Sequence, residues 1–134
     1  MALEFAAEGA AAIDPYPIPL ERGDPAIADW GPLIESVLAD RRTGVSTGEI
    51  SARFHESVAA LAEDVAVRVR APRVALAGGC FQNARLLLRV KERLTRRGFD
   101  VYTPRAFPPN DGGISLGQVL VASRRFFERR APCA

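Results

Sequence analysis

The sequence contains one histidine and two cysteines, and this scarcity limits the sites that the chain can build alone. A single histidine cannot form a multi-histidine metal site, and the helical spacing of ARFHESV predicts that His55 is a packing or surface residue. Cys80 and Cys133 are too few and too differently placed for a disulfide framework or a zinc site, so we expect free thiols. A nucleophilic Cys80 is the weaker interpretation, because no partner base accompanies it.

Long apolar runs are absent as well. No run approaches the ~18 apolar residues of a membrane span. The opening MALEFAAEGAAAID lacks a basic start and contains Glu4 and Glu8, unlike a signal peptide. We therefore expect a cytoplasmic protein without membrane contact. The 134 residues, of which 48% are hydrophobic and 25% charged, fit one globular domain over 1–134.

Acidic and basic residues are unevenly divided along the chain, although the net charge is only +2. Residues 1–72 contain 12 acidic residues and 6 arginines, whereas residues 73–134 contain 12 basic and 4 acidic residues. An anionic ligand is therefore expected to bind the second half. The stretch SRRFFERR, residues 123–130, predicts a basic helix end rather than a nucleic-acid site.

Residues 1–30 predict an irregular entry segment at an edge of the fold. A helical remnant over 1–12 is expected to end at Asp14, because Pro15 disfavours helical geometry in the residue before it. Four prolines between positions 15 and 30 predict an irregular hairpin, since proline is tolerated where no backbone donor is needed.

Two helices are expected next, over 31–41 and 47–70. Ser46 with Glu49 three residues later matches a capping box at the start of the longer helix. Apolar residues then recur at helical spacing and predict its buried face: Ile50, Phe54, Val58, Leu61, Val65 and Val69. The solvent-facing side is expected to contain Glu56, Glu63, Asp64 and Arg68.

After Pro72 the sequence predicts a strand–helix–strand–helix core, which completes a compact region over 31–134. RVALAG is a short apolar run between Pro72 and a glycine pair, as is typical of a buried strand. Residues 81–97 predict a helix and 99–103 a second strand, and such a unit is nearly always parallel. The predicted inward residues of that helix are Leu86, Leu87, Val90 and Leu94. With a closing helix over 113–129, the expected fold class is α/β.

Gly78 and Gly79 occupy the predicted turn from the first strand into its helix. The carboxyl ends of parallel strands are where open α/β sheets bind ligands, and glycine lets a phosphate or ribose approach the backbone. Asn83 adds an amide that could bind an anion or a sugar hydroxyl. The alternative is a tight turn without a ligand, in which Asn83 bonds to local backbone.

Asp111 occupies the equivalent place after the second strand. In the crevice it could be an oxygen ligand for a divalent cation that accompanies a nucleotide phosphate. The alternative is equally open, because Asn or Asp before a helix is also a preferred N-cap. The two loops are expected to emerge side by side at one edge of the sheet.

GGCFQN (78–83) and PPNDGGISLGQ (108–118) together resemble the HypF family of carbamoyltransferases, which mature nickel-iron hydrogenases. The likeness continues upstream through ADWGPLIESVLAD (28–40) and ISARFHESVA (50–59), so it covers essentially the whole chain. The related tRNA threonylcarbamoyl-transfer proteins have a looser version of both motifs.

The resemblance implies the C-terminal lobe of an actin-like ATPase (ribonuclease H-like) fold, with a small parallel or mixed sheet and packed helices. HypF proteins are large and modular. They convert carbamoyl phosphate and ATP to carbamoyl adenylate, and the last domain transfers the carbamoyl group to the C-terminal cysteine of HypE. By the family pattern, Gly78, Gly79 and Asn83 would line the ATP site, and Asp111 would be a ligand of a divalent metal ion.

The chain departs from the family in lacking counterparts of the other metal ligands, which include histidines of the preceding half-domain; His55 belongs to a different element. We therefore expect a fragment or a separately encoded half that is inactive alone and completed by the missing N-terminal half or a second chain. Apolar surface left uncovered would promote self-association. The alternatives are a non-catalytic nucleotide-binding or protein-interaction module, and a related carbamoyl or threonylcarbamoyl transferase.

Overall fold

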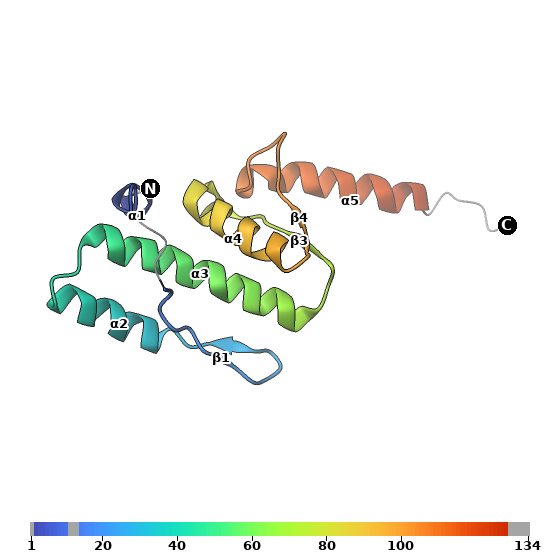
Figure 1. Cartoon of the computed structure of the whole chain (residues 1–134). Helices are drawn as coiled ribbons and strands as arrows, with labels where there is room; N and C mark the ends of the chain where they lie inside the picture. Colours follow the sequence, from blue (N-terminus) through green and yellow to red (C-terminus); the bar gives the residue numbers. More distant parts are fainter. Residues whose placement is uncertain (1, 11–13, 129–134) are drawn as a thin grey trace.

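The computed structural model describes residues 2–10 and 14–128. Helix α3 lies between α2 and a parallel strand–helix–strand unit, and a final helix extends away from this body (Figure 1). The elements in chain order are α1 Ala2–Ala6, β1 Leu20–Glu21, β2 Ile27–Ala28, α2 Gly31–Arg42, α3 Thr47–Val69, β3 Arg73–Ala75, the 3-10 helix η1 Gly79–Gln82, α4 Ala84–Arg96, β4 Asp100–Tyr102, the 3-10 helix η2 Asp111–Gly113, and α5 Ile114–Glu128.

The entry segment confirms the predicted hairpin. Strands β1 and β2 pair antiparallel, with Leu20 opposite Ala28. Helix α1 ends at Ala6, earlier than the predicted 1–12, and positions 1, 11 and 12 lie outside the described residues.

Helix α3 begins where the sequence predicts. The Ser46 hydroxyl accepts the Glu49 backbone N–H while the Glu49 carboxylate accepts the Ser46 N–H, so the capping box is formed. The helix ends at Val69, and its C-cap residue Arg70 adopts a left-handed conformation with φ 59°, two residues before Pro72.

Strands β3 and β4 pair in parallel, with Val74 opposite Val101, and α4 connects them. Helix α4 starts later than the predicted 81, because Asn83 caps it and η1 precedes it. The α3–α4 contact holds the core, and the buried members of this cluster are Ala59, Ala66, Leu76, Leu86, Val90 and Leu94. Three of the four predicted inward residues of α4 are thus buried, and Leu87 packs against the cluster in part.

The buried face of α3 differs from the prediction. Glu56 and Glu63, predicted to face solvent, are 6% and 7% exposed, whereas Val65 and Val69 are 42% and 66% exposed. The small side chain of Ala59, fully buried, lets α4 approach α3 closely on this side. The helix is therefore turned so that two carboxylates face α4, which supplies arginines to them.

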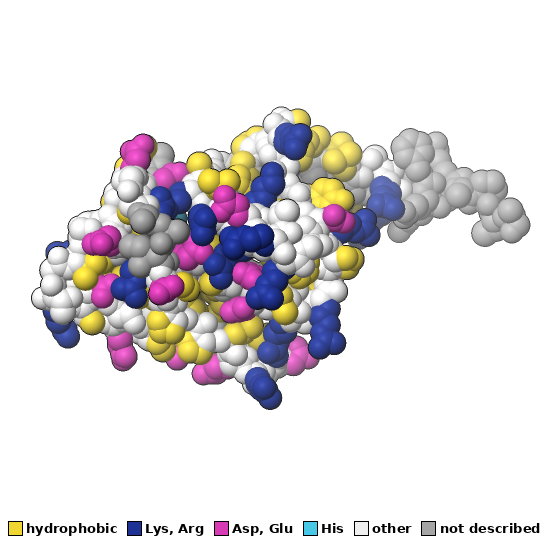
Figure 2. All heavy atoms as spheres, in the orientation of Figure 1, with side chains coloured by type: hydrophobic (Ala, Val, Ile, Leu, Met, Phe, Trp, Pro, Cys, Tyr) yellow, Lys and Arg dark blue, Asp and Glu magenta, His cyan; other side chains and the backbone are white. Residues whose placement is uncertain are grey.

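Two arginines of α4 and its C-cap residue, Arg97, pair with these two buried carboxylates. Arg89 Nε lies 2.7 Å from Glu56, and Arg93 lies 2.5 Å from Glu56 and 2.8 Å from Glu63. Arg97 pairs with Glu63 as well. Three of the 12 basic residues expected to favour an anionic ligand are therefore paired with carboxylates of α3. Figure 2 shows basic and acidic side chains interleaved on this face rather than one basic patch.

Helix α5 is largely uncovered. Its main contact with another element is with η2, which directly precedes it. Its apolar side chains are at least 44% exposed at Ile114, Leu116, Val119, Leu120, Val121 and Phe126. The helix reaches Glu128, so position 129 of the predicted 113–129 lies outside the described residues. No helix in the described part of the chain is long and apolar enough to cross a membrane.

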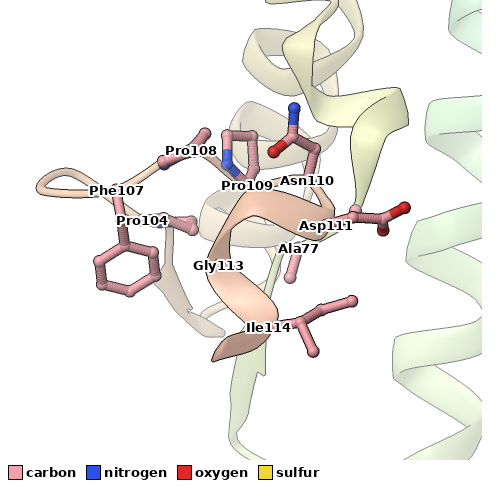
Figure 3. A pocket seen from close by; sticks show the side chains of 10 residues that line it. Ala77, Pro104, Phe107, Pro108, Pro109, Asn110, Asp111, Gly113 and Ile114 are labelled. Atoms are coloured by element: carbon pink, nitrogen blue, oxygen red, sulfur yellow. The ribbon is translucent and has the colours of Figure 1, made fainter. Parts of the chain in front are cut away.

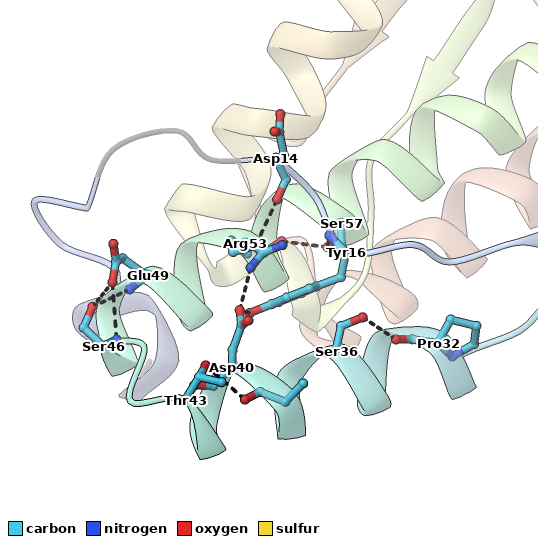
Figure 4. A network of polar contacts seen from close by, with 11 residues as sticks. Asp14, Tyr16, Pro32, Ser36, Asp40, Thr43, Ser46, Glu49, Arg53 and Ser57 are labelled. Carbon is cyan, nitrogen blue, oxygen red and sulfur yellow. Dashed lines mark hydrogen bonds and ion pairs between the residues drawn. The ribbon is translucent and has the colours of Figure 1, made fainter.

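The proline-rich entry is fastened to α2 and α3 by one polar network (Figure 4). The Tyr16 backbone N–H donates to Ser57 Oγ at 2.7 Å, and the Tyr16 hydroxyl donates to Asp40 at 2.6 Å. Arg53 pairs with Asp40 at 2.5 Å, lies 4.2 Å above the Tyr16 ring and donates to the Asp14 carbonyl. Buried polar groups are thereby satisfied although the segment has little regular structure.

Replacing Glu56 with glutamine tests the buried ion pairs. Burial raises the pKa of Glu56, but hydrogen bonds and charge from Arg89 and Arg93 outweigh it and hold the pKa below its usual range. Such a group stabilises the fold above its unfolded pKa of about 4.3, and this contribution disappears as pH falls through the folded pKa. We expect Glu56→Gln to cost about 1–3 kcal/mol at neutral pH and to lose less stability than the parent on acidification.

Urea unfolding at several pH values measures this. Asp64→Asn, an exposed acidic position on the same helix, is the control and should change little. Equal losses in both variants would show that the α3–α4 pairs do not stabilise the fold.

The two tyrosines give a matched test of the entry network. Burial and the bond to the Asp40 carboxylate raise the pKa of Tyr16 to about 12. Stability from a raised pKa is present below the unfolded value of about 10 and lost as pH rises toward the folded one. We expect Tyr16→Phe to cost about 1.5–3 kcal/mol in urea unfolding, as for a hydrogen bond to a charged group.

Tyr102→Phe is the control, since Tyr102 is 57% exposed. In that variant Tyr16 is the one remaining tyrosine. A free phenol is half ionised at a pH of about 10, and at that pH we expect no phenolate absorbance from Tyr16. Half-ionisation of Tyr16 at that pH in the folded protein would contradict the network.

Candidate functional site

The two strand-to-helix junctions lie side by side, as predicted from parallel pairing. The Gly78 N–H donates to the Pro109 carbonyl at 2.5 Å, which ties the first junction to the second. A Cβ on Gly79 would lie 4.0 Å from the Cβ of Asn110. The junctions after β3 and β4 therefore form one continuous surface at the carboxyl ends of the strands.

A hollow of about 330 Å³ opens between the junctions. The first contributes Ala77 and Gly78, and the second contributes the proline-rich loop and the start of α5. Figure 3 shows the Asp111 carboxylate pointing away from Phe107, which lies on the other side of the hollow. One wall is thus apolar and the other ends in an exposed acidic group.

Gly78 has a backbone conformation that requires glycine. Its φ of 111° and ψ of 156° lie in a region essentially closed to residues with a side chain. Gly79 has no such restriction, and a Cβ there would make only ordinary van der Waals contact. The first glycine therefore makes the turn, and the second keeps the surface beside Asn110 open.

The backbone donors at the start of α4 are already occupied. Asn83 Oδ1 accepts from the Leu86 N–H at 2.9 Å. The Glu4 carboxylate accepts from Ala84 at 2.6 Å and from Arg85 at 3.3 Å. An anion at this junction would therefore bind at the Gly78–Gly79 turn, because the backbone N–H groups in the first turn of α4 already donate to protein side chains.

Asn83 makes the local backbone hydrogen bond that the alternative interpretation predicted, with the Leu86 N–H. It also lines a second hollow. This hollow, about 490 Å³, is lined by Gly79, Cys80, Gln82, Asn83 and Leu86. The Asn83 amide nitrogen lies 2.8 Å from Nε2 of His55. Its position on the surface shared with Gly79 is compatible with ligand binding, whereas its own polar atoms are engaged by the protein.

Asn110, not Asp111, caps the helix after the second strand. Asn110 Oδ1 accepts from the Gly112 N–H at 3.0 Å. Asp111 is exposed, and its carboxylate has no hydrogen bond or ion pair with another described residue. The cap role is therefore filled, and the Asp111 carboxylate is available for a ligand.

A metal ion would need more ligands than this surface provides. Among the described residues, no group of three or more His, Cys, Asp or Glu side chains could hold one. Divalent magnesium or calcium takes six or more oxygen ligands. Asp111 can therefore contribute one ligand here, and the others would come from outside the described part of the chain.

Sequence reasoning missed Glu4 and the contact of His55 with Asn83. His55 is 3% exposed, which confirms a packing position, and Cys80 is a free, exposed thiol; Cys133 lies outside the described residues. Glu4 lies 80 residues before Ala84 and His55 lies 28 residues before Asn83. No local pattern in the sequence indicates such long-range pairs. A weak hint of the second contact is that His55, a polar residue, lies in the part of α3 where apolar residues recur at helical spacing.

The two glycines give a matched prediction. Gly78→Ala should lower the free energy of unfolding by about 1–3 kcal/mol, because alanine must adopt the strained backbone. Gly79→Ala should cost less than about 1 kcal/mol, since its Cβ fits. Urea unfolding of both variants measures this, and equal costs would mean that the turn at Gly78 is not required.

The chain matches a family model described as the second subdomain of the Kae1-like domain of carbamoyltransferases, over residues 1–118. It is 40% identical over 106 residues to carbamoyltransferase HypF of Synechocystis, covering 78% of this chain and 14% of that protein. It is 43% identical over 101 residues to HypF2 of Cupriavidus necator, covering 72% and 12%. A HypF homolog from the same bacterium is 34% identical over 124 residues, covering 81% and 32%.

Solved structures confirm the predicted fold class. Full-length HypF in a phosphate- and nucleotide-bound form superposes with a TM-score of 0.85 at 35% identity, covering 91% of this chain and 16% of that one. HypF of T. kodakarensis has the same fold, with a TM-score of 0.73 at 22% identity over 90% of this chain and 16% of that one. The chain thus spans a small part of these proteins, and it belongs to the HypF carbamoyltransferase family, as the second subdomain of the Kae1-like domain.

Proposed function

We propose that this chain forms one wall of the nucleotide and metal site of a HypF-type carbamoyltransferase. In that reaction a carbamoyl group passes from carbamoyl adenylate, made from carbamoyl phosphate and ATP, to the C-terminal cysteine of a HypE-type acceptor. The observation that carries the proposal is the joining of the Gly78–Gly79 turn and Asp111 at the carboxyl ends of two parallel strands. A relative with this fold and 35% identity was solved with phosphate and nucleotide bound.

Each part of this surface has a separate task in the proposal. The Gly78–Gly79 turn admits a phosphate or ribose close to the backbone, since neither residue has a Cβ. The apolar wall around Phe107 excludes water from one side of the hollow. Asp111 would hold a divalent cation in part, and such an ion would neutralise phosphate charge when bound.

The chain alone should be inactive. The hollow is open on one side, and the described residues supply one carboxylate where a cation needs several ligands. The first subdomain of the same domain, or a second chain, would close the hollow and supply the missing cation ligands. The uncovered apolar residues of α5 fit such a partner, and in its absence the isolated chain should self-associate.

The exposed side of α5 also favours a second candidate function. A protein-interaction or nucleotide-binding module without transferase activity would keep the same fold and the same uncovered helix. Nucleotide binding by the completed domain, together with carbamoyl transfer, distinguishes the two.

Calorimetry on the chain mixed with the rest of its domain tests the proposal. ATP with magnesium should bind, and Asp111→Asn should weaken binding by roughly tenfold in the presence of magnesium, because one oxygen ligand is lost. Asp100→Asn, at the opposite end of β4, should leave affinity unchanged. Absence of any nucleotide response in the completed domain would refute the proposal, as would carbamoyl transfer at full rate by the isolated chain.

A further inference from the structure

His55 connects the middle of α3 to the candidate site. It is 3% exposed, so both ring nitrogens must find partners within the protein. Nδ1 lies 2.7 Å from the Ser51 carbonyl oxygen, and Nε2 lies 2.8 Å from the amide nitrogen of Asn83. His55 is the single histidine of the chain and lies outside both hollows.

The neighbouring groups determine where the proton sits on this ring. The Leu86 N–H can only donate, so the oxygen of the Asn83 amide must face it, at 2.9 Å. The Asn83 NH₂ then faces His55, and because it too can only donate, Nε2 must accept. The Ser51 carbonyl can only accept, so Nδ1 carries the hydrogen. A neutral ring protonated at Nδ1 satisfies all four groups.

Every other state of His55 leaves a mismatch. With the hydrogen on Nε2, two acceptors face each other at Ser51 and two donors face each other at Asn83. Turning the Asn83 amide removes the second mismatch but sets its NH₂ against the Leu86 N–H, so the cap of α4 is lost. A doubly protonated ring repairs the Ser51 contact alone. Unpaired buried groups are costly, so these states are disfavoured.

We infer that His55 is a positioning residue for the glycine junction. Its unprotonated Nε2 holds the Asn83 amide in the one orientation that caps α4. The capped turn sets the course of the backbone from Gly79 to Asn83, which lines the second hollow. The consequence for ligand binding rests on the function proposed above, whereas the protonation state and the cap do not.

The surroundings of His55 restrain the same junction from a third helix. The Ser51 hydroxyl donates to the Leu3 carbonyl of α1, and the Glu4 carboxylate of α1 accepts from Ala84 and Arg85 of α4. Helices α1, α3 and α4 thus meet at the start of α4, and His55 supplies the contact between α3 and α4 at this point.

Nitrogen-15 NMR of the histidine ring tests the protonation state directly. Because the untagged chain has one histidine, its ring signals need no assignment. At neutral pH we expect a pyrrole-type Nδ1 and a pyridine-type Nε2. A ring protonated at Nε2, or at both nitrogens, would overturn the inference whether or not any variant folds.

Amide hydrogen exchange at Leu86 tests the positioning role. His55→Leu supplies an apolar side chain of similar size without the ring nitrogens, and should speed exchange of the Leu86 N–H about fivefold, as expected for loss of a helix cap. His55→Gln offers a side-chain oxygen in place of Nε2 and should restore slow exchange. Ser57→Ala, a buried polar change in the same helix, should leave this amide unchanged. Unaltered exchange in His55→Leu, or failure of glutamine to rescue, would overturn the inference.

Nucleotide affinity of the completed domain separates this inference from the proposed function. We expect His55→Leu to bind ATP with magnesium severalfold more weakly and His55→Gln to resemble the parent. If the parent binds no nucleotide, the proposed function fails, while the NMR and exchange results still decide the positioning role. If the parent binds and His55→Leu binds equally well, the positioning role fails alone.

Discussion

The parallel pairing of β3 with β4 is the constraint on which the candidate site depends. Three residue pairs set the register, from Arg73 opposite Asp100 to Ala75 opposite Tyr102, so both strands end at the same edge. The loop after each strand must then cross that edge, and the bond from Gly78 to Pro109 joins them. An antiparallel arrangement would send the two motifs to opposite ends of the pair and separate Asp111 from the glycine turn.

Such a short strand pair needs external support, and the α3–α4 contact provides it. The apolar cluster between the two helices includes Leu76, which follows β3 directly. Beside this cluster, Glu56 pairs with Arg89 and Arg93 of α4. Glu63 pairs with Arg93 and with Arg97, which follows α4. Buried carboxylates need such partners, and the pairs specify one rotation of α3 about its axis. Helix α4 is thereby held against α3, and its capped first turn places the Gly78–Asn83 loop.

The uncovered helix α5 and the open hollow have one explanation, a site shared between two subdomains. The chain corresponds to the second subdomain of a Kae1-like domain and spans 12–32% of the relatives described above. Among the described residues, nothing covers the apolar residues of α5, and no group of further carboxylates or histidines joins Asp111. A site shared between two subdomains accounts for both, because each would supply part of the ligand set and part of the buried surface.

Local chemistry in the sequence determined the elements and their order. The capping box at Ser46, the glycine pair, and the proline boundaries act within a few residues, so the start of α3, the hairpin and the strand–helix–strand unit could be predicted. The same motifs indicated the family and the neighbouring junctions. Which face of α3 is buried was decided only by tertiary structure, since an apolar stripe and a stripe of alanines with glutamates are both compatible with helical spacing. Likewise, the contacts of Glu4 and His55 with the start of α4 join residues far apart in the chain, and only three-dimensional packing brings such donors and acceptors together.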